Sequence, residues 1–378
     1  MHLDACWDDG GCPPATAMIR VLVVDDSAVC RDFLSHILAS DPRIEVVGAV
    51  ADGASALEAA IAIRPDVITM DIEMPGMNGY EATRKIMESA PTPIIVVSAA
   101  DNVREIGMSF HAIESGALSV LPKPHGGDSP ESQKQSAELV LMVKLMAEVK
   151  VIRRWTRDQE ETHPAAKPRE APAERPAATA REGGPVVLIG ASTGGPMPIR
   201  TILSLLPRGF PAAVLVVQHI ASGFGAGFAE WLAGFCDLPV RIAVDGESVL
   251  PGRVYVAPDG AHLGVEKGPR IRFGLGAPEN GLKPSVSYLF RTAAQVYGKD
   301  AVAILLSGMG KDGAEELKAL KDGGAVTYAQ DRASCVIFGM PGEAVRLGGA
   351  SFTLPPEGIA AALLSLVRAS AGTTGGKP

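Results

Sequence analysis

The sequence predicts an α/β protein of two domains, each with a mainly parallel β-sheet, joined by a linker. Short apolar runs alternate with helix-like segments in both halves of the chain, as expected for parallel sheets covered by helices on both faces. The chain has 378 residues, more than one typical domain, and 47% of them are hydrophobic, enough for two sizeable cores. A stretch without Leu, Ile, Val or Phe, at 156–184, separates the two halves.

The first half contains five strand-like runs, which are IRVLVVDDS, IEVVGAVAD, PDVITMDIEMPGMNG, PIIVVSA and ALSVLPKP. Helices are predicted between them at about 28–39 and 54–62. A longer amphipathic helix is predicted from about Pro130 to Trp155, because apolar residues recur at helical spacing on one side: Leu139, Met142, Val143, Met146 and Val149. We expect this helix to pack on its own domain, with a dimerisation or partner-binding helix as the alternative.

Residues 156–184 are predicted to form an extended, mobile linker. Proline recurs at every fourth position among Ala, Glu and Arg residues, at Pro164, Pro168, Pro172 and Pro176. Fully stretched as polyproline, this segment would reach roughly 90 Å. The predicted organisation is therefore a disordered extension (1–17), a first domain (18–155), the linker (156–184), a second domain (185–370) and a disordered tail (371–378).

The second half again alternates strands and helices. Nearly continuous apolar runs at 186–189, 213–217 and 302–306 are typical of buried parallel strands. The segment 252–274 alternates more strongly and contains turn residues, which predicts an antiparallel hairpin. We therefore expect a doubly wound, mainly parallel α/β domain.

Composition and charge exclude several classes of protein. The formal net charge of −8 and the lack of a basic helix-turn-helix argue against a transcriptional regulator or another nucleic-acid-binding protein. The five cysteines are scattered without metal-ligand spacing, so we expect reduced thiols and a cytoplasmic protein. Neither a signal peptide nor an apolar run long enough to cross a membrane is found in the sequence.

Acidic, hydroxyl and amine side chains stand at the ends of four strands of the first half. Asp25 and Asp26 follow the first strand, Asp71 follows the third, and Ser98 and Lys123 end the fourth and fifth. The carboxyl ends of parallel strands share one rim of the sheet, where ligands bind. Three carboxylates at one place require a cation, and oxygen ligands suit Mg²⁺. A divalent ion and a lysine together neutralise a phosphoryl group. A lone aspartate at such a position is more often a helix cap, but five matching residues argue against that explanation.

Four motifs in the first half, VLVVDDS, DIEMPGMNG, VVSA and PKP, resemble the landmarks of response-regulator receiver domains. The resemblance runs from residue 19 to about 150 and implies a flavodoxin-like (βα)5 fold. It implies that Asp71 accepts a phosphoryl group from a histidine kinase, with Ser98 and Lys123 contacting the phosphoryl oxygens. It also implies a Mg²⁺ site formed by Asp25, Asp26, Asp71 and the backbone carbonyl of Glu73.

Two further expectations concern the last strand of this domain. The resemblance implies a cis peptide bond between Lys123 and Pro124. Receiver domains often have an aromatic switch residue where Val120 stands. Its replacement by valine argues against the usual aromatic–hydroxyl switch, but not against phosphorylation.

The stretch VVLIGASTGGP, at 186–196, allows two interpretations. A phosphate-binding P-loop needs a Lys followed by Ser or Thr at its end, but Gly195 is followed by Pro196, and the glycine spacing does not fit a dinucleotide fold. The alternative is a nucleophilic serine, because residues 190–194 satisfy G-x-S-x-G where a strand runs into a turn. This motif is weak alone, because a nucleophile also needs a base and an orienting acid.

The second half supplies residues for both roles. His219 follows the strand-like run 213–217, whereas His262 lies in a turn or hairpin. Asp312 stands just past the run at 302–306, so Ser192, His219 and Asp312 are expected at one rim of the sheet. The order Ser, His, Asp along the chain excludes the α/β-hydrolase, subtilisin and chymotrypsin families, but triads are recognised by role rather than order.

The motifs IGASTGGP, VVQHI, KPSVSYLF and LLSGMGKDG, in this order, resemble those of the catalytic domain of CheB methylesterases, from about 185 to 368. The resemblance implies Ser192 as nucleophile, His219 as general base and acid, and Asp312 as orienting acid. Backbone amides near Met309, together with Thr193, are implied at the oxyanion site. The family often has Asp where Ser287 stands, which is not a triad position. The glycines around Ser192 are interpreted as room for a turn and for close approach by receptor backbone.

The resemblance implies a protein-glutamate methylesterase and protein-glutamine glutaminase of a two-component chemosensory pathway. The expected substrates are methyl-accepting chemoreceptors, whose γ-glutamyl methyl esters are hydrolysed and whose glutamines are deamidated. No cofactor is expected for ester hydrolysis. The expected protein is a cytoplasmic monomer that approaches the membrane only through receptors. A phospho-dependent adaptor without catalysis is the alternative, and the Ser-His-Asp set argues against it.

The two-domain organisation predicts regulation by phosphorylation. We expect the unphosphorylated first domain to pack against the rim near Ser192, and phosphorylation of Asp71 to loosen that packing. The linker would permit such a movement. A comparison of the full chain with residues 185–378 alone would test this expectation.

Overall fold

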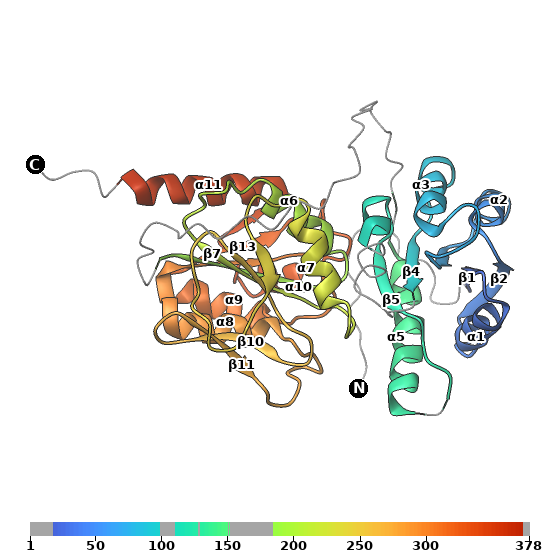
Figure 1. Ribbon diagram of the computed structural model, residues 1–378, viewed down its shortest axis with the longest axis horizontal. Helices are drawn as coiled ribbons and strands as arrows, with labels where there is room; N and C mark the ends of the chain where they lie inside the picture. The colour runs from blue at the N-terminus through green and yellow to red at the C-terminus, as the bar shows by residue number, and fades with distance from the viewer. Residues whose placement is uncertain (1–17, 99–109, 128, 150, 152–183, 373–378) are drawn as a thin grey trace, which may run out of the picture. The chain divides into compact units, whose positions relative to one another are not determined.

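The computed structural model describes residues 18–98, 110–127, 129–149, 151 and 184–372, which divide into two compact units (Figure 1). The predicted extension at 1–17 and the end of the predicted tail, 373–378, lie outside the described residues. So does the predicted linker, apart from Gly184. Its predicted extended conformation therefore stays a prediction.

The first unit contains a five-stranded sheet in which every neighbouring pair of strands is parallel. Its order, β2-β1-β3-β4-β5, is that of a flavodoxin-like doubly wound sheet. The strands are β1 (Ile19–Val24), β2 (Ile44–Val50), β3 (Val67–Met70), β4 (Ile94–Ser98) and β5 (Ser119–Pro122). Because β1 and β3 are neighbours, the aspartates that follow them meet at one end of the sheet.

Helices of the first unit begin at side-chain caps. They are α1 (Ala28–Ala39), α2 (Gly53–Ile63), α3 (Gly79–Ser89) and α5 (Pro130–Met146). Each has a short polar residue at its N-cap, whose side chain accepts a backbone N–H of the first turn: Ser27, Asp52, Asn78 and Ser129. The predicted range of α1 is confirmed, and α2 is one residue longer at each end than predicted.

The helix predicted to run to Trp155 is shorter than expected. It ends at Met146, because the N–H groups of Glu148 and Val149 bond to carbonyls three residues back instead of four. Trp155 itself lies outside the described residues. The packing prediction holds for the ordered part, since α5 buries Leu139, Val143 and Met146 within this unit.

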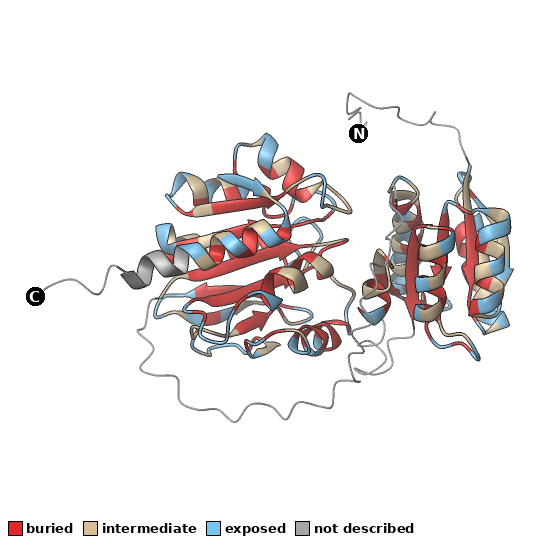
Figure 2. Cartoon of the chain, turned by 90° about the horizontal axis from the view of Figure 1, so that it is seen from above, coloured by how far each residue is buried: buried red, intermediate tan, exposed pale blue. Residues whose placement is uncertain are grey.

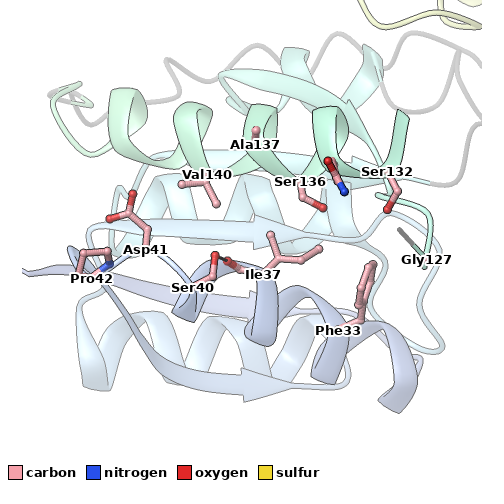
Figure 3. Close-up of a pocket in the computed structure, with 11 residues that line it drawn as sticks. Phe33, Ile37, Ser40, Asp41, Pro42, Gly127, Ser132, Ser136, Ala137 and Val140 are labelled. Atoms are coloured by element: carbon pink, nitrogen blue, oxygen red, sulfur yellow. Dashed lines mark hydrogen bonds between the residues drawn. The ribbon is translucent and has the colours of Figure 1, made fainter. Parts of the chain in front are cut away.

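A hollow of about 460 Å³ lies between α1 and α5 (Figure 3). Phe33 and Ile37 of α1 face Ala137 and Val140 of α5 across it. At one end Asp41 accepts a hydrogen bond of 2.7 Å from Lys144 Nζ. None of the predicted site residues lines this hollow.

The second unit is built on a seven-stranded sheet of order β14-β13-β12-β6-β7-β9-β8, again with every neighbouring pair parallel. Its strands are β6 (Val186–Ala191), β7 (Ala213–Gln218), β8 (Val240–Ile242), β9 (Val254–Val256), β12 (Ala301–Leu305), β13 (Val326–Gln330) and β14 (Phe352–Leu354). The predicted hairpin is confirmed: β10 (His262–Glu266) pairs antiparallel with β11 (Arg270–Gly274). The first part of the segment 252–274, however, joins the parallel sheet as β9.

Helices cover both faces of this sheet (Figure 1). On one side α6 (Pro196–Ser204) packs with α11 (Pro356–Gly372), and on the other α8 (Val286–Tyr297) packs with α9 (Ala314–Asp322). The remaining elements are α7 (Gly225–Ala233), α10 (Met340–Arg346) and the 3₁₀ turn η1 (Gly298–Asp300). β6, β7 and β9 are buried along their whole length, which explains why nearly all their residues are apolar. Figure 2 shows buried residues in red along strands of this unit.

Two predictions from composition, on the cysteines and on membrane-spanning segments, can be compared only with the described residues. Cys30, Cys236 and Cys335 are free thiols, whereas Cys6 and Cys12 lie outside the described residues. Within the described ranges, no helix has the length and apolar character needed to cross a membrane.

Candidate active site

Ser192 and His219 directly follow the neighbouring strands β6 and β7, and Asp312 lies in the loop between β12 and α9. β6 lies between β12 and β7, and Ala191 pairs with Gln218 in the register of β6 and β7. The pairing continues one residue further, because the N–H of His219 donates to the carbonyl of Ala191 at 2.9 Å. On the other side, the N–H of Ser192 donates to the carbonyl of Ser307, beyond β12, at 3.0 Å. The structure thus brings the predicted nucleophile and base to adjacent positions on one rim.

The glycines around Ser192 let the turn pack against the protein itself. Gly194 has a φ of +75°, which favours glycine, and a Cβ there would lie 2.5 Å from Val336. A Cβ on Gly190 would lie 2.3 Å from Val286 of α8. The expectation that these glycines make room for receptor backbone is therefore wrong for Gly190 and Gly194, because side chains of this chain already occupy that space.

His219 is held by Asp312 through one ring nitrogen. Its Nε2 lies 2.9 Å from Asp312 Oδ2, and its Nδ1 is buried without a hydrogen-bond partner in the described part of the chain. A carboxylate accepts only, so Nε2 carries the proton and Nδ1 is left as the acceptor. Within the same residues, Ser192 Oγ makes no hydrogen bond to His219. A catalytic hydrogen bond is often absent before substrate binds.

Asp312 accepts four hydrogen bonds, three of them from the start of α8. Oδ1 accepts from the Ser285 hydroxyl at 2.8 Å and the Ser287 N–H at 3.2 Å, and Oδ2 accepts from the Val286 N–H at 2.6 Å. Burial acts to raise the pKa of Asp312, but His219 and the hydrogen bonds from Ser287 and Val286 outweigh it and hold the pKa well below its ordinary value. Asp312 is therefore an anion at neutral pH.

Sequence reasoning missed the supporting role of Ser285. The motif KPSVSYLF contained the signal, since a serine directly before an apolar helical run predicts an N-cap. Ser285 does cap α8, and its side chain accepts from the N–H of Tyr288. Ser287, which departs from the family pattern, uses its hydroxyl to accept the N–H of Gly313 at 2.9 Å. It therefore stabilises the segment that carries Asp312.

His262 does not belong to the predicted triad. It is buried, its Nε2 lies 3.1 Å from the carbonyl of Ala277, and its Nδ1 accepts the N–H of Ser285. Its ring stacks on Tyr288. All its polar atoms are therefore engaged, which is the arrangement of a structural histidine.

Backbone N–H groups near Ser192 remain available for a developing oxyanion. Among the described residues, no acceptor receives the N–H of Thr193 or of Met309. The carbonyl of Thr193 accepts the Ser307 hydroxyl at 2.8 Å, which fixes the turn. The side chain of Met309 is 41% exposed.

The predicted acidic site forms at the end of the sheet in the first unit. Carboxylate oxygens of Asp25, Asp26 and Asp71 all lie within 4.8 Å of one another. Lys123 Nζ lies 2.7 Å from Asp71 Oδ2 and 2.8 Å from Asp25 Oδ2. The N–H of Lys123 donates to the carbonyl of Ser98, which brings the ends of β4 and β5 together. Glu73 follows Asp71 by two residues, and its side chain is exposed and outside this group.

These residues fit a hard divalent cation. Burial raises the pKa of Asp71, and the nearby charge of Asp25 adds to this effect, although Lys123 acts in the opposite direction. Burial acts to lower the pKa of Lys123, but Asp25 and Asp71 outweigh it and the pKa lies above its ordinary value. Three clustered carboxylates, two of them buried, are the oxygen-rich donor set that suits Mg²⁺.

One expectation for this site is wrong. Among the described residues the cis peptide bond is Lys283–Pro284, so Lys123–Pro124 is trans. Val120 is buried in β5 and pairs with Val96 of β4. This position therefore offers no aromatic ring to follow the phosphorylation state.

Comparisons with known proteins place both units in described families. The response regulator receiver domain matches residues 21–129, and the CheB methylesterase domain matches residues 187–363. Three proteins named protein-glutamate methylesterase/protein-glutamine glutaminase are similar over nearly their whole length. That of Nitrosospira multiformis is 52% identical over 93% of this chain and 97% of its own. The Geobacter metallireducens protein is 52% identical, covering 92% and 99%, and that of Syntrophus aciditrophicus is 50% identical, covering 92% and 98%.

The chain belongs to the CheB methylesterase family. Its receiver domain and catalytic domain follow in the order that the sequence motifs predicted. Membership in the CheB family confirms the predicted family and α/β architecture. The roles of single residues rest on the geometry described above.

Proposed function

We propose that this chain hydrolyses γ-glutamyl methyl esters, and deamidates glutamines, on methyl-accepting chemoreceptors. The observation that carries the proposal is the placement of Ser192 and His219 at the paired ends of β6 and β7, with Asp312 bonded to His219 from the loop after β12. Relatives that are 50% identical or more over nearly the whole chain bear the name of this activity. An open rim, rather than a deep pocket, suits a side chain presented on the surface of a receptor helix.

The proposed chemistry is acyl transfer through Ser192. Ser192 Oγ attacks the ester carbonyl while His219 Nδ1 takes its proton, and Asp312 stabilises the resulting imidazolium through Nε2–H. The N–H groups of Thr193 and Met309 face the developing oxyanion. The imidazolium returns the proton to the methoxide, so that methanol leaves and an acyl-serine remains. Water, activated by the same nitrogen, then releases a free glutamate, and an amide reacts likewise with loss of ammonia.

We infer that the receiver domain is the input that a histidine kinase controls. Asp71 is the proposed phosphoryl acceptor, and Lys123 and Ser98 contact the phosphoryl oxygens. A Mg²⁺ ion held by Asp25, Asp26, Asp71 and the carbonyl of Glu73 would neutralise phosphoryl charge. The three clustered carboxylates, two of them buried, and the adjacent Lys123 support this assignment. A cytoplasmic location, with membranes reached only through receptors, follows from this role.

Methanol release from membranes that carry methylated receptors tests the proposal. The native chain should release methanol, and a small-molecule phosphodonor should increase the rate. Ser192→Ala should abolish release and preserve receptor binding, which separates an esterase from a non-catalytic adaptor. Methanol release that persists in Ser192→Ala would refute the assignment of the nucleophile.

A further inference from the structure

Gln218, the last residue of β7, joins the backbones of the proposed nucleophile and base. It is 4% exposed, and its side-chain Nε2 donates to the carbonyl oxygens of Ser192 and His219, both at 2.8 Å. The Ser192 carbonyl also accepts the N–H of Gly195, which closes the turn. One amide group therefore connects the turn that carries Ser192 with the strand end that carries His219.

The contacts define the orientation of this amide. Both partners are carbonyl oxygens, which accept only, so the amide nitrogen has to face them. Oε1 then lies against Gly195, where a Cβ would come within 2.4 Å of it. Oε1 is buried and has no hydrogen-bond partner in the described part of the chain.

Packing alone does not explain a glutamine at this position. A buried polar atom without a partner destabilises the folded state, and an apolar side chain of similar length would fill the same space without that penalty. The gain from the amide lies in its two donated hydrogen bonds. Both connect residues of the proposed acyl-transfer site.

We propose that Gln218 is a positioning residue for ester hydrolysis. Its carboxamide sets the distance and orientation between the Ser192 turn and His219. No hydrogen bond joins Ser192 Oγ to His219 Nδ1 in the described residues, so the backbone has to hold the two groups ready. A displacement of about 1 Å between reacting groups can slow a reaction about 100-fold. The inference rests on the proposed function, in which Ser192 and His219 carry the chemistry.

The test measures the reactivity of Ser192 without a receptor. The full-length chain is labelled with an aryl sulfonyl fluoride, which forms a sulfonyl–Oγ bond at an activated serine and releases fluoride. Gln218→Met keeps the length of the side chain and removes both hydrogen bonds. It should slow labelling at least about tenfold and lower kcat for methanol release by a similar factor. KM for methylated receptors should stay within about twofold, because Gln218 is buried away from substrate.

Thr327→Val is the matched control. Thr327 is fully buried in β13 of the same sheet, and its hydroxyl bonds to the carbonyl of Gly349 at 2.7 Å and to Ser351. The control loses buried hydrogen bonds, yet should label at the native rate. Gln218→Glu is a second, isosteric variant that points an acceptor at two carbonyls, and it should also label slowly. Circular dichroism at the assay temperature confirms that each variant is folded.

The outcomes separate this inference from the proposed function. Equal labelling rates in the native chain and folded Gln218 variants would overturn the positioning role, as would a change confined to KM. Slow labelling in Thr327→Val as well would also overturn it, because general loosening of the sheet would then explain the effect. A native chain that is not labelled at Ser192 would instead overturn the nucleophile assignment.

Discussion

Asp312, in the motif LLSGMGKDG, contacts both His219 and the first turn of α8 through hydrogen bonds. Its four hydrogen bonds orient the carboxylate and thereby fix which nitrogen of His219 is protonated. In chymotrypsin the aspartate bonds Nδ1, whereas here Asp312 bonds Nε2. In the proposed mechanism, Nδ1 of His219 therefore takes the proton of the serine.

Asp312→Asn should lower kcat for methanol release by about 10³-fold, because an amide bonded to His219 favours the wrong tautomer. Methanol release at saturating receptor measures the effect. The control is Asp322→Asn, which removes an exposed partner of Lys318 and should keep the native rate. A rate within a few-fold of native in folded Asp312→Asn would contradict the orienting role.

Asp71→Asn should stabilise the first unit at neutral pH. The folded-state pKa of Asp71 is raised, so between its ordinary value of 3.8 and the raised value the folded state binds more protons than the unfolded state. The free energy of unfolding therefore falls as pH rises through that window, and the loss is complete above it. Asp71→Asn removes the ionisable group and hence this loss, so the stabilisation by the variant should shrink as pH falls toward 3.8.

Hydrogen exchange of the amides of β1 and β3 measures this stability. Asp32→Asn, an exposed aspartate of α1, is the control and should change nothing. Mg²⁺ should protect the native chain more than Asp71→Asn, because the variant lacks one of the three clustered carboxylates. Equal protection of both chains by Mg²⁺ would argue against the proposed cation site.

At the level of elements, α8 contributes to the site through its first turn. Its N-cap Ser285 bonds Asp312, and the N–H groups of Val286 and Ser287 add to that contact. The positive end of the helix dipole therefore faces the carboxylate of the triad. An element distant in sequence from both Ser192 and His219 thus stabilises the charge on which they depend.

Ser285→Ala should lower the free energy of unfolding by about 1–2 kcal/mol and also reduce kcat. Ser129→Ala is the matched variant, because Ser129 caps α5 in the same way but lies in the other unit. It should destabilise its unit by about 1 kcal/mol and leave kcat unchanged. Urea unfolding and methanol release measure the two effects. If both variants reduced kcat equally, Ser285 would have no specific role.

Elements differ in how far sequence alone predicts them. Nearly continuous apolar runs located β6, β7 and β12, because a strand that is buried on both faces needs apolar residues at almost every position. The end of α5 was misjudged by several residues, since Val149 continues the apolar pattern and only the backbone hydrogen bonds show the helix closing.

The site was predicted in the same uneven way. Strand ends located Ser192, His219 and the acidic residues, since parallel strands share one rim, and Asp312 was found in the loop after β12. Gln218 and Ser285 were missed, because a side-chain amide or hydroxyl leaves no periodic signal of its partners. The prediction of a cis Lys123–Pro124 bond was wrong. The cis and trans forms of a bond before proline differ by only about 0.5–1 kcal/mol, so tertiary contacts decide which form occurs.

At the scale of the whole molecule, the family predicts that phosphorylation controls hydrolysis. A small-molecule phosphodonor should raise the rate of methanol release by the native chain, and Asp71→Asn should remove that increase. Residues 185–378 alone should be faster than the unphosphorylated full chain, as expected if the receiver domain is inhibitory. An isolated catalytic domain no faster than the unphosphorylated full chain would show that autoinhibition is wrong.

The chain order of the three residues proposed for catalysis sets the earliest point of synthesis at which the site can assemble. His219 and Asp312 are 93 residues apart in sequence, so their contact closes a long loop. A growing chain that has not yet added Asp312 lacks the proposed orienting acid for His219. We therefore expect chains that end before Asp312 to hydrolyse esters far more slowly than the full chain.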